Sequence, residues 1–295
     1  MSRLFRSVLR HILGVLVFLP LLVGAIVVQA VLGNGVFRNQ TAIPGLIYRA
    51  CGWFLGVHFS LNPISAPVSE GNVTMFVANH LARYDFVGLH LFPNAVVMVN
   101  ARVFEMPVWG SVIKIFASSS GFIPTRQSKD GKHMELDQLA QAAQEGRNAF
   151  VFPEGIQSDG RRVLRYSEGS AEIFYDKELL AKYPALRTAQ LQPVVLRVKT
   201  IDGENVMDQP SKWEPYALTH QLSNPILALS RLLTTGSVTV DTLICPPLDP
   251  REFDTAADLI NAAHELTRSI VAPDQTEALT RKQWKERLLS RDFSL

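Results

Sequence analysis

The pattern of hydrophobic and polar positions changes near residue 57. Before that point, residues 12–37 carry no charged side chain, and a second apolar stretch follows at residues 43–57. A membrane-crossing helix needs about 20 apolar residues, so the first run is long enough for one. Beyond residue 57, short apolar runs alternate with longer segments of helical periodicity. The sequence therefore predicts two parts, a membrane-anchoring helical segment over residues 1–56 and a folded domain over residues 57–295.

Three interpretations of the first apolar run stay open. The run exceeds the roughly 7–15 apolar residues of a secretory signal peptide. Three arginines precede it, and Arg38 and Arg49 follow it, so the flanking charges give a simple span no clear orientation. Pro20 lies inside the run and favours a kink. A bent insertion that enters and leaves on one face, a spanning helix and a cleaved signal remain as alternatives.

Apolar runs in the body of the chain are predicted to be buried strands. Several are rich in Val and are bounded by Asn, Gly or Pro. Strands are expected at residues 57–61, 73–78, 95–99, 149–152, 192–198 and 237–244. Helices are expected at residues 86–91, 108–118, 134–144, 170–182, 225–233, 256–270 and 276–289. This alternation predicts one α/β domain with a mostly parallel central sheet flanked by helices.

The composition excludes several classes of protein. The chain has 29 basic and 27 acidic side chains, so it lacks the basic excess that favours nucleic acid as a partner. Only 19% of its residues are charged, and 47% are hydrophobic, which excludes intrinsic disorder. Cys51 and Cys245 are too few for a disulfide framework or a cysteine metal site. The chain is therefore expected to be a globular protein that associates with a membrane.

The first candidate for chemistry is Asn-His-Leu-Ala-Arg-Tyr-Asp at residues 79–85, directly after the predicted strand at 73–78. Ligands of open α/β sheets bind at the carboxyl ends of strands. His80 and Asp85 would diverge by about 140° on a regular helix, so they meet only if His80 lies in a loop and Asp85 begins the next helix. Asp85 would then fix the imidazole tautomer and make the other ring nitrogen a base. The structural alternative is that the two residues cap a loop and a helix.

Further segments place polar residues at predicted strand ends. Phe-Pro-Glu-Gly at residues 152–155 pairs a carboxylate with a glycine that lets a ligand approach the backbone. Residues 121–126 form a short apolar strand followed by Arg126, whose guanidinium suits a phosphate or a carboxylate. A turn and a surface ion pair explain these two segments equally well. Pro193 is predicted to lie near the start of another strand. The prediction of a functional site rests on the order of these segments and on their common place at strand ends.

In this order the segments resemble the glycerophospholipid acyltransferase family. Its four blocks are Asn-His-x4-Asp, an apolar block ending in Arg, Phe-Pro-Glu-Gly, and an apolar strand with Pro, and they correspond to residues 79–85, 121–126, 152–155 and 191–195. The resemblance implies a membrane-bound O-acyltransferase of phospholipid biosynthesis. Such an enzyme moves a fatty acyl group from acyl-CoA or acyl carrier protein to the hydroxyl of a lysophospholipid such as 1-acylglycerol-3-phosphate.

The resemblance also implies roles for individual residues. His80 is expected to be the general base and Asp85 its orienting partner. Substrate binding is expected of Asn79, Arg126, Phe152, Pro153, Glu154 and Gly155, with Arg126 holding the headgroup anion of the acceptor. The chemistry agrees, because an alcohol must lose its proton as it attacks a thioester. A Gly-x-Ser-x-Gly elbow is missing from the sequence, which favours direct attack over a serine acyl-enzyme.

The resemblance implies neither a cofactor nor a metal beyond the acyl donor. His80, Asp85 and His90 do not match a recognised metal-ligand spacing either. The expected partners are a lysolipid acceptor, the acyl-CoA or acyl carrier protein donor and the membrane, with no nucleic acid. The expected location is the cytoplasmic face of a bacterial inner membrane.

Two positions depart from the family pattern. In the family the third block ordinarily continues Thr-Arg-Ser, whereas residues 156–158 of this chain are Ile-Gln-Ser. Further on, family members often have Phe-Lys-x-Gly, whereas residues 166–169 of this chain are Tyr-Ser-Glu-Gly. The missing arginine would ordinarily contact a phosphate, and Arg161, Arg162 or Arg165 would have to substitute for it. Otherwise the acceptor would lack a phosphomonoester. Residues 192–194, with Asp202 and Gly203 soon after, resemble relatives that acylate lyso-ornithine lipid, which is therefore the alternative acceptor. A thioester hydrolase and an inactive lipid-binding relative are the alternative functions.

Overall fold

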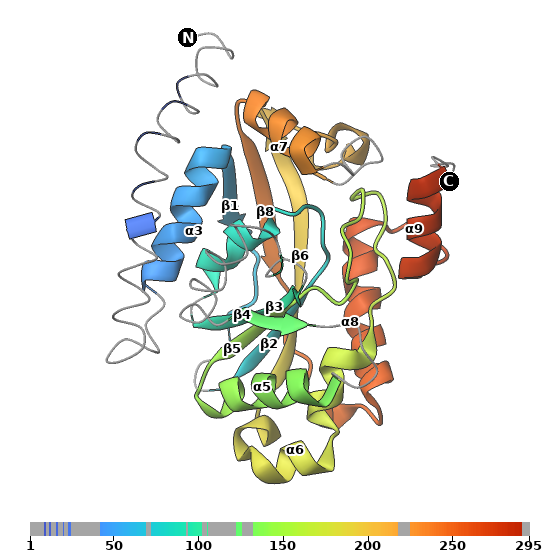
Figure 1. Ribbon diagram of the computed structural model, residues 1–295. Helices are drawn as coiled ribbons and strands as arrows, with labels where there is room; N and C mark the ends of the chain where they lie inside the picture. The colour runs from blue at the N-terminus through green and yellow to red at the C-terminus, as the bar shows by residue number, and fades with distance from the viewer. Residues whose placement is uncertain are drawn as a thin grey trace.

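A computed structural model describes most of the 295-residue chain (Figure 1). The described residues are 42–68, 72–92, 94–101, 105, 122–125, 132–217 and 225–290, with single positions at 9, 12, 16, 20, 23 and 24. Of the apolar run at 12–37 only single positions are described, and the helix expected at 108–118 and Arg126 lie outside the described residues. The membrane anchor therefore stays a prediction.

Among the helices that the structure describes, none is both long enough and apolar enough to cross a membrane.

One sheet of eight strands lies at the centre of the described part of the chain, in the order β1-β8-β6-β2-β5-β3-β4, with β7 paired to β6. The strands are β1 Val57–Leu61, β2 Thr74–Ala78, β3 Ala95–Asn100, β4 Phe122–Thr125, β5 Asn148–Val151, β6 Gln190–Ile201, β7 Glu204–Asn205 and β8 Val238–Ile244. Strands β6, β2, β5, β3 and β4 are mutually parallel. Strand β8 runs antiparallel to β6 and parallel to β1. The predicted α/β fold with a mostly parallel sheet is confirmed.

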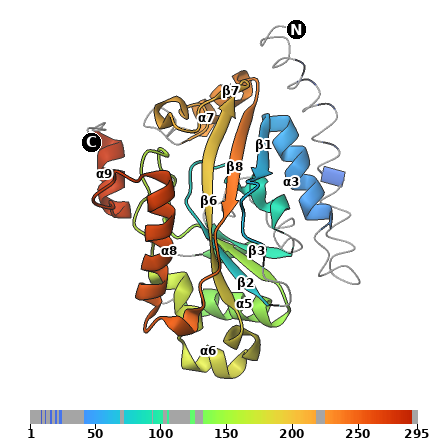
Figure 2. The same ribbon diagram turned by 180° about the vertical axis from the view of Figure 1, so that it is seen from behind.

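Helices cover both faces of the sheet (Figures 1 and 2). The α-helices are α3 Ala42–Leu55, α5 Lys132–Gln144, α6 Lys177–Lys182, α7 Pro225–Thr234, α8 Ala256–Val271 and α9 Arg281–Ser290. The 3₁₀ helices are η2 Asp85–Leu91, η4 Glu168–Phe174, η5 Pro184–Arg187, η6 Pro210–Lys212 and η8 Pro250–Glu252. Helices α5, α8 and η4 bury their apolar sides against one face, and α3, α7 and η2 bury theirs against the other.

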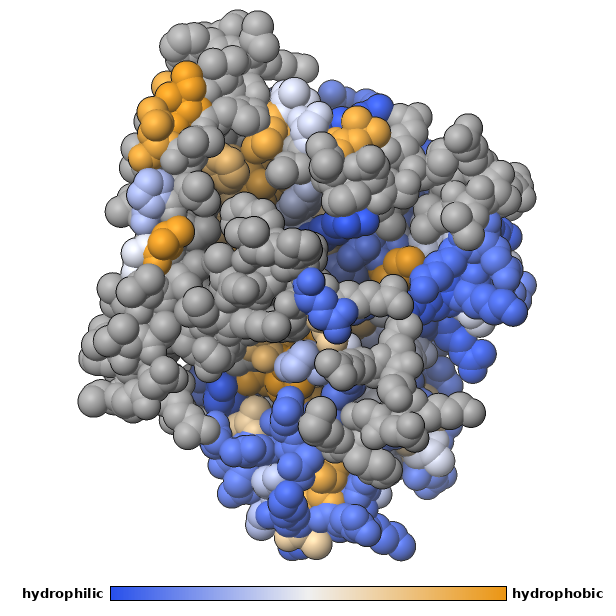
Figure 3. Space-filling model, viewed as in Figure 1, coloured by the Kyte–Doolittle hydropathy of each residue, from blue (hydrophilic) through white to orange (hydrophobic). Residues whose placement is uncertain are grey.

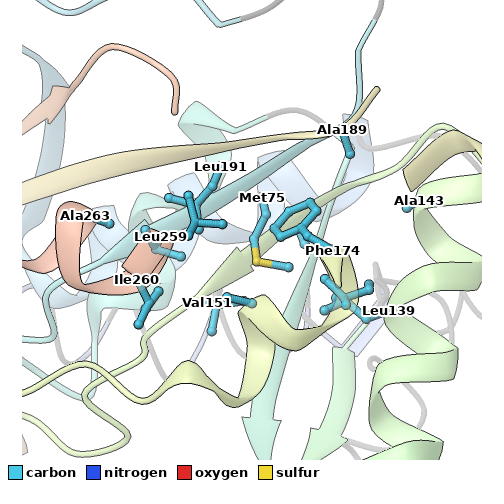
Figure 4. Packing of buried hydrophobic residues seen from close by; sticks show 14 of the residues in the cluster. Met75, Leu139, Ala143, Val151, Phe174, Ala189, Leu191, Leu259, Ile260 and Ala263 are labelled. Carbon is cyan, nitrogen blue, oxygen red and sulfur yellow. The ribbon is translucent and has the colours of Figure 1, made fainter. Parts of the chain in front are cut away.

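Strand β2 shows how the sheet divides the core into two layers. Met75 and Val77 belong to the cluster under α5 and α8, whereas Phe76 and Ala78 belong to the cluster under α3 and η2. Successive side chains of a strand point to opposite faces, so a strand covered on both faces is apolar throughout. In the first cluster Met75 lies beside Phe174 (Figure 4). This two-sided burial explains why the strands appear in the sequence as short, unbroken apolar runs.

The single helix expected at residues 170–182 is two shorter ones in the structure. Helix η4 ends at Phe174, and α6 starts again at Lys177. The Asp176 side chain accepts hydrogen bonds from the backbone N–H groups of Glu178 and Leu179. An aspartate in this N-cap position begins a new helix and so interrupts a continuous one.

The last helix begins later than the expected residue 276. Helix α9 starts at Arg281. Gln283 N–H donates to Thr280 Oγ1 at 3.3 Å, and Thr280 N–H donates to Gln283 Oε1 at 2.7 Å. This reciprocal pair is a capping box, which satisfies backbone donors at the start of a helix. The box places Arg281 at the first helical position.

Pro193 lies inside β6 rather than near its start, because the strand begins at Gln190. A proline has no N–H to donate and is disfavoured in the interior of a sheet. Its carbonyl accepts a hydrogen bond from Cys245 N–H, just past the last residue of β8. The N–H that proline lacks would face the carbonyl of Cys245, and that carbonyl accepts from Gln192 Nε2 at 3.0 Å instead.

Candidate active site

His80 and the segment after β5 meet because β2 and β5 are neighbours in the sheet. Val77 of β2 pairs with Val151 of β5, so the two parallel strands end at the same level. The His80 and Phe152 rings stack there, with centroids 4.2 Å apart and planes inclined by 22°. Two segments that are far apart in the sequence thus form one site at the carboxyl edge of the sheet.

His80 and Asp85 form the contact that their spacing predicts. His80 lies in the loop after β2, and Asp85 is the first residue of η2. Nδ1 of His80 is 2.8 Å from Oδ2 of Asp85. A carboxylate accepts hydrogen bonds, so this contact places the imidazole proton on Nδ1 and leaves a lone pair on Nε2. The His80 side chain is 15% exposed while that of Asp85 is fully buried, so the base reaches the surface and its partner does not.

Asp85 is held by three hydrogen bonds besides the one to His80. Its Oδ2 accepts from the backbone N–H groups of Leu81 and Ala82, at 2.8 and 3.0 Å. Its Oδ1 accepts from the Tyr216 hydroxyl at 2.7 Å. Such bonds compensate for the burial of the carboxylate and fix the plane in which it faces the imidazole. Sequence reasoning missed Tyr216, because no spacing links it to a residue 131 positions away.

Replacing Tyr216 by phenylalanine should destabilise the fold. Burial raises the pKa of Tyr216 well above its ordinary value, and the charge of Asp85 adds to the rise, so the hydroxyl remains a donor. The variant leaves Asp85 Oδ1 without this bond. We expect the free energy of unfolding to fall by about 1.5–3 kcal/mol, measured by urea denaturation.

The matched control is Tyr84→Phe, because Tyr84 lies next to Asp85 in the chain and donates none of the hydrogen bonds described for that carboxylate. An equal loss of stability in both variants would show that the Tyr216 hydroxyl contributes nothing specific.

Glu154 lies beneath His80 and is buried, with 1% of its surface exposed. Its Oε1 accepts a hydrogen bond from the backbone N–H of His80 at 3.2 Å. Burial raises the pKa of Glu154 well above its ordinary value, and the nearby charges of Asp85 and Asp159 contribute to the rise. The geometry therefore favours a role in positioning the His80 main chain over the acceptor contact that the resemblance implies.

The buried Glu154 carboxyl should make stability depend on pH. Because its pKa is raised in the folded state, the folded protein holds this proton more tightly than the unfolded chain does. The resulting stabilisation is complete below the ordinary pKa of 4.5 and is lost as the pH rises from there through the raised folded pKa. Glu154→Gln stays neutral and still offers an oxygen to His80 N–H. Its free energy of unfolding should therefore fall less than that of the wild type on going from about pH 5 to about pH 8.

Urea denaturation at each pH measures this difference, and Glu168→Gln, an exposed carboxyl at the start of η4, serves as the control. A pH dependence that is unchanged in Glu154→Gln would contradict the expectation.

Asn79 joins the end of β2 to the middle of β6. Its Nδ2 donates to the carbonyl of Leu196 at 3.0 Å, and its Oδ1 accepts from the N–H of Leu196 at 2.8 Å. The side chain is 1% exposed. Both polar ends are engaged by the main chain, so the geometry favours a positioning role beneath His80 over the predicted substrate contact.

The four residues of Phe-Pro-Glu-Gly form a turn of which only the ends reach the surface. Gly155 N–H donates to the carbonyl of Phe152 at 3.0 Å, and the φ of Gly155 is +64°, a region that favours glycine. Pro153 is buried, and its carbonyl accepts from Ser167 N–H. Phe152 is half-buried and Gly155 is exposed, so these two are placed to contact a substrate.

Gln157 is a site residue that sequence reasoning noted only as a departure. Its Nε2 lies 2.9 Å from Nε2 of His80. The amide can donate to the ring nitrogen in the tautomer that Asp85 imposes. Ser158 N–H donates to the carbonyl of His80 at 2.7 Å, which holds this loop against the histidine. Gln157 therefore occupies the position that a hydroxyl must take to give its proton to Nε2.

The three arginines considered as substitutes for the missing cation differ in burial. Arg161 and Arg165 are exposed, and Arg162 is buried. The Arg162 guanidinium lies over the ring of Trp284, 5.3 Å from its centroid. Arg126 falls outside the described residues, so its expected contact with a headgroup stays a prediction.

Comparison with known proteins shows which family the segment around this site resembles. The family model for Acyltransferase matches residues 65–197, which include His80, Asp85 and Glu154. Residues 65–197 therefore form an acyltransferase domain similar to that of the glycerophospholipid acyltransferases. The predicted resemblance is thereby confirmed, and the chain is an acyltransferase. Tyr216 and the whole of α9 contribute to the structure from outside the matched segment.

Two relatives accompany the family match. The acyltransferase is 24% identical over 228 residues to a lyso-ornithine lipid O-acyltransferase of Rhodobacter capsulatus, covering 77% of this chain and 75% of that protein. It also resembles the crystal structure of the 1-acyl-sn-glycerophosphate (LPA) acyltransferase PlsC from Thermotoga maritima, with a TM-score of 0.53. That likeness covers 93% of this chain and 98% of the other at 16% identity, and it shows the fold alone.

Within the described ranges of this acyltransferase, no group of three or more His, Cys, Asp or Glu side chains is arranged to hold a metal ion.

Proposed function

We propose that this acyltransferase moves a fatty acyl group from acyl-CoA or acyl carrier protein to the free hydroxyl of a lysophospholipid such as 1-acylglycerol-3-phosphate. The observation that supports the proposal is the contact of 2.8 Å between His80 Nδ1 and Asp85 Oδ2 at the end of β2. The contact leaves Nε2 of a partly exposed imidazole as a base. A hydroxyl nucleophile needs such a base as it attacks a thioester.

Each bond and proton of the proposed reaction has a defined place. The hydroxyl oxygen of the acceptor attacks the thioester carbonyl while its proton passes to Nε2 of His80. The buried Asp85 carboxylate stabilises the imidazolium that forms. The carbon–sulfur bond then breaks, and the imidazolium returns the proton to the leaving thiolate. The reaction as proposed uses neither a metal nor a redox cofactor.

Gln157 has to move before this reaction can begin. Its amide lies 2.9 Å from the Nε2 atom that must accept the proton. A glutamine side chain rotates freely about its single bonds, so a small rotation exchanges the amide for the hydroxyl of an incoming acceptor. The amide would then lie close enough to bond the acceptor oxygen.

We place the enzyme at a membrane, on the cytoplasmic face of a bacterial inner membrane, where lysolipids and their products reside. The uncharged run at residues 12–37 supports this location. Helix α3 exposes Leu46 to 66% and Trp53 to 51%. In Figure 3 hydrophobic side chains are visible on the left, the side on which α3 lies in Figure 1, whereas the described surface at the lower right is mostly hydrophilic.

Lyso-ornithine lipid is the second candidate acceptor. It is favoured by the Rhodobacter capsulatus relative, which is named a lyso-ornithine lipid O-acyltransferase. It is also favoured by Gln157, which stands where the family pattern has an arginine that ordinarily contacts a phosphate. Both acceptors present a hydroxyl to His80, so the proposed mechanism is the same for each.

A transfer assay with the purified full-length chain tests the proposal. Labelled acyl-CoA and labelled acyl carrier protein are each offered with lysophosphatidate, with lyso-ornithine lipid or without acceptor, and the lipids are separated by chromatography. Label in phosphatidate supports the first acceptor, and label in ornithine lipid supports the second. Free fatty acid formed equally without acceptor would show a thioester hydrolase. Donor binding without any product would show an inactive lipid-binding relative, and either of these two results would overturn the proposed function.

A further inference from the structure

The segment that leads into α9 is attached to the active-site loop that follows β5. The side chain of Gln275 bonds both backbone groups of Val163, accepting from its N–H at 2.9 Å and donating to its carbonyl at 3.0 Å. Arg165 N–H donates to the carbonyl of Leu279 at 2.9 Å. Figure 1 shows α9 beside this loop. These bonds fix where the first turn of α9 lies relative to the site.

Trp284 connects α9 to the residue that contacts the base. Its indole Nε1–H donates to the carbonyl of Gln157 at 2.9 Å, and the side chain is completely buried. The amide of the same Gln157 lies against Nε2 of His80. The position of α9 and the position of the loop at the base are therefore set together.

The side chain of Arg281, the first residue of α9, lies next to Gly155. A Cβ atom added to Gly155 would lie 3.1 Å from Nη1 of Arg281 and 3.5 Å from its Cζ. Gly155 directly follows Glu154, which bonds the backbone of His80. Burial lowers the pKa of Arg281, yet an arginine keeps its charge in proteins. The positively charged Arg281 therefore lies beside Gly155, next in the chain to the carboxyl that bonds the His80 backbone.

A second guanidinium, that of Arg162, lies in the loop after β5 and has donors that the described residues do not satisfy. Arg162 is 5% exposed, and its Nε and Nη2 atoms are buried without a hydrogen-bond partner among the described residues. Its ion pair with Asp159 spans 3.7 Å, which is longer than a hydrogen bond. The buried hydroxyl of Ser158 also has no partner in the described part of the chain. Buried donors left in this way cost free energy, and an anionic ligand is one group that would satisfy them.

We propose that α9 completes the acceptor site, with Arg281 binding an anionic group of the acceptor's headgroup over Gly155 and Arg162 supporting it from the loop. The inference rests on the proposed function and specifies its substrate as a lysolipid whose headgroup carries a phosphate or a carboxylate. A guanidinium binds either group with two parallel hydrogen bonds. Holding the anion there directs the hydroxyl of the same molecule toward His80. Arg281, which selects the acceptor in this proposal, lies outside residues 65–197, the segment that the family model matches.

The test compares Arg281→Gln with Lys282→Gln in the full-length chain. Lys282 is the next residue of α9 and is exposed, so the control removes the same charge from the same helical turn. Acyl transfer is measured with lysophosphatidate, lyso-ornithine lipid and neutral monoacylglycerol, and the anionic acceptor that the wild type uses better identifies the headgroup. In Arg281→Gln we expect the KM for that acceptor to rise about 10- to 100-fold, with a much smaller change in kcat. Monoacylglycerol kinetics and the control should stay unchanged.

Arg281→Lys provides a second test if Arg281→Gln is unstable. A lysine keeps the charge but loses the paired geometry, so its KM should lie between those of the wild type and Arg281→Gln. An unchanged KM, an equal loss with monoacylglycerol or an effect confined to kcat would overturn the proposal.

A wild type that acylates no lysolipid would refute the proposed function without deciding the anion site. Calorimetric titration with 1-hexanoylglycerol-3-phosphate, against hexanoylglycerol as the neutral probe, then decides it. Weaker binding of the phosphate compound to Arg281→Gln but not to Lys282→Gln supports the site, and equal binding to both variants overturns it.

Discussion

Replacing His80 by alanine is expected to lower kcat for acyl transfer by about 10²–10⁴-fold, a loss of about 3–5 kcal/mol of transition-state stabilisation. The reason is geometric. Asp85 holds the proton on Nδ1, so Nε2 is the atom of this side chain that takes the proton of the acceptor. Without it, the hydroxyl attacks the thioester with its proton still attached. Initial rates at saturating donor and acceptor measure the effect.

His90→Ala is the matched control for this experiment. His90 lies on the same 3₁₀ helix as Asp85, and its Nδ1 is 2.7 Å from the carbonyl of Val87. The control removes an imidazole of the same size without touching the pair of His80 and Asp85. A His80→Ala enzyme that keeps the full rate of transfer would contradict the general-base mechanism.

The second large effect is expected from Asp85→Asn, which should lower kcat by about 10²–10⁴-fold. The four hydrogen bonds described at the Asp85 carboxylate are all donated to its oxygens, by His80, two backbone N–H groups and Tyr216. An asparagine has only one oxygen, and its NH₂ group must face at least one of those donors. Where the NH₂ group faces Nδ1 the imidazole loses its acceptor, and where the oxygen faces Nδ1 the acceptor has lost its charge, so the tautomer with a free Nε2 is less favoured and the imidazolium is less stabilised.

Heteronuclear NMR of the histidine side chains gives a second measurement on the same variant. The His80 proton should move from Nδ1 in the wild type toward Nε2 in Asp85→Asn. Asp137→Asn, which alters an exposed ion pair with Lys182, serves as the control for charge. If kcat and the tautomer both stay unchanged in Asp85→Asn, the aspartate has only a structural role, holding the loop at Leu81 and Ala82 before η2.

Much of the fold was predictable because it follows from local patterns. Strand β2 is buried along its whole length and apolar from Met75 to Ala78, since helices cover both of its faces. The pair of His80 and Asp85 was predictable for a similar reason, because a loop and the first turn of a helix bring residues five positions apart into contact. The start of α9 was also present in the sequence as Thr280 and Gln283, although the expected helix began earlier.

The rest of the site depends on contacts between distant parts of the chain. Tyr216 reaches Asp85 from 131 residues away, and Trp284 reaches Gln157 from 127 residues away. Neither contact leaves a periodic or spaced signal, because each depends on how separate elements pack. The burial of Glu154 is a similar case, since a Pro-Glu-Gly turn can present its carboxylate to solvent or to the main chain of a neighbouring loop.

The sequence by itself determined the α/β class, the order of most elements and the base with its orienting acid, because hydrophobic periodicity and short-range geometry act within a few residues. Only the tertiary structure decided which groups surround that base. The pairing of β2 with β5 brings Phe152 and Glu154 to His80, and the packing of α9 brings Arg281 over Gly155. Sheet order and helix docking are properties of the whole chain, since each is set by the burial of many side chains at once. The acceptor's surroundings were therefore settled by the fold and not by any one motif.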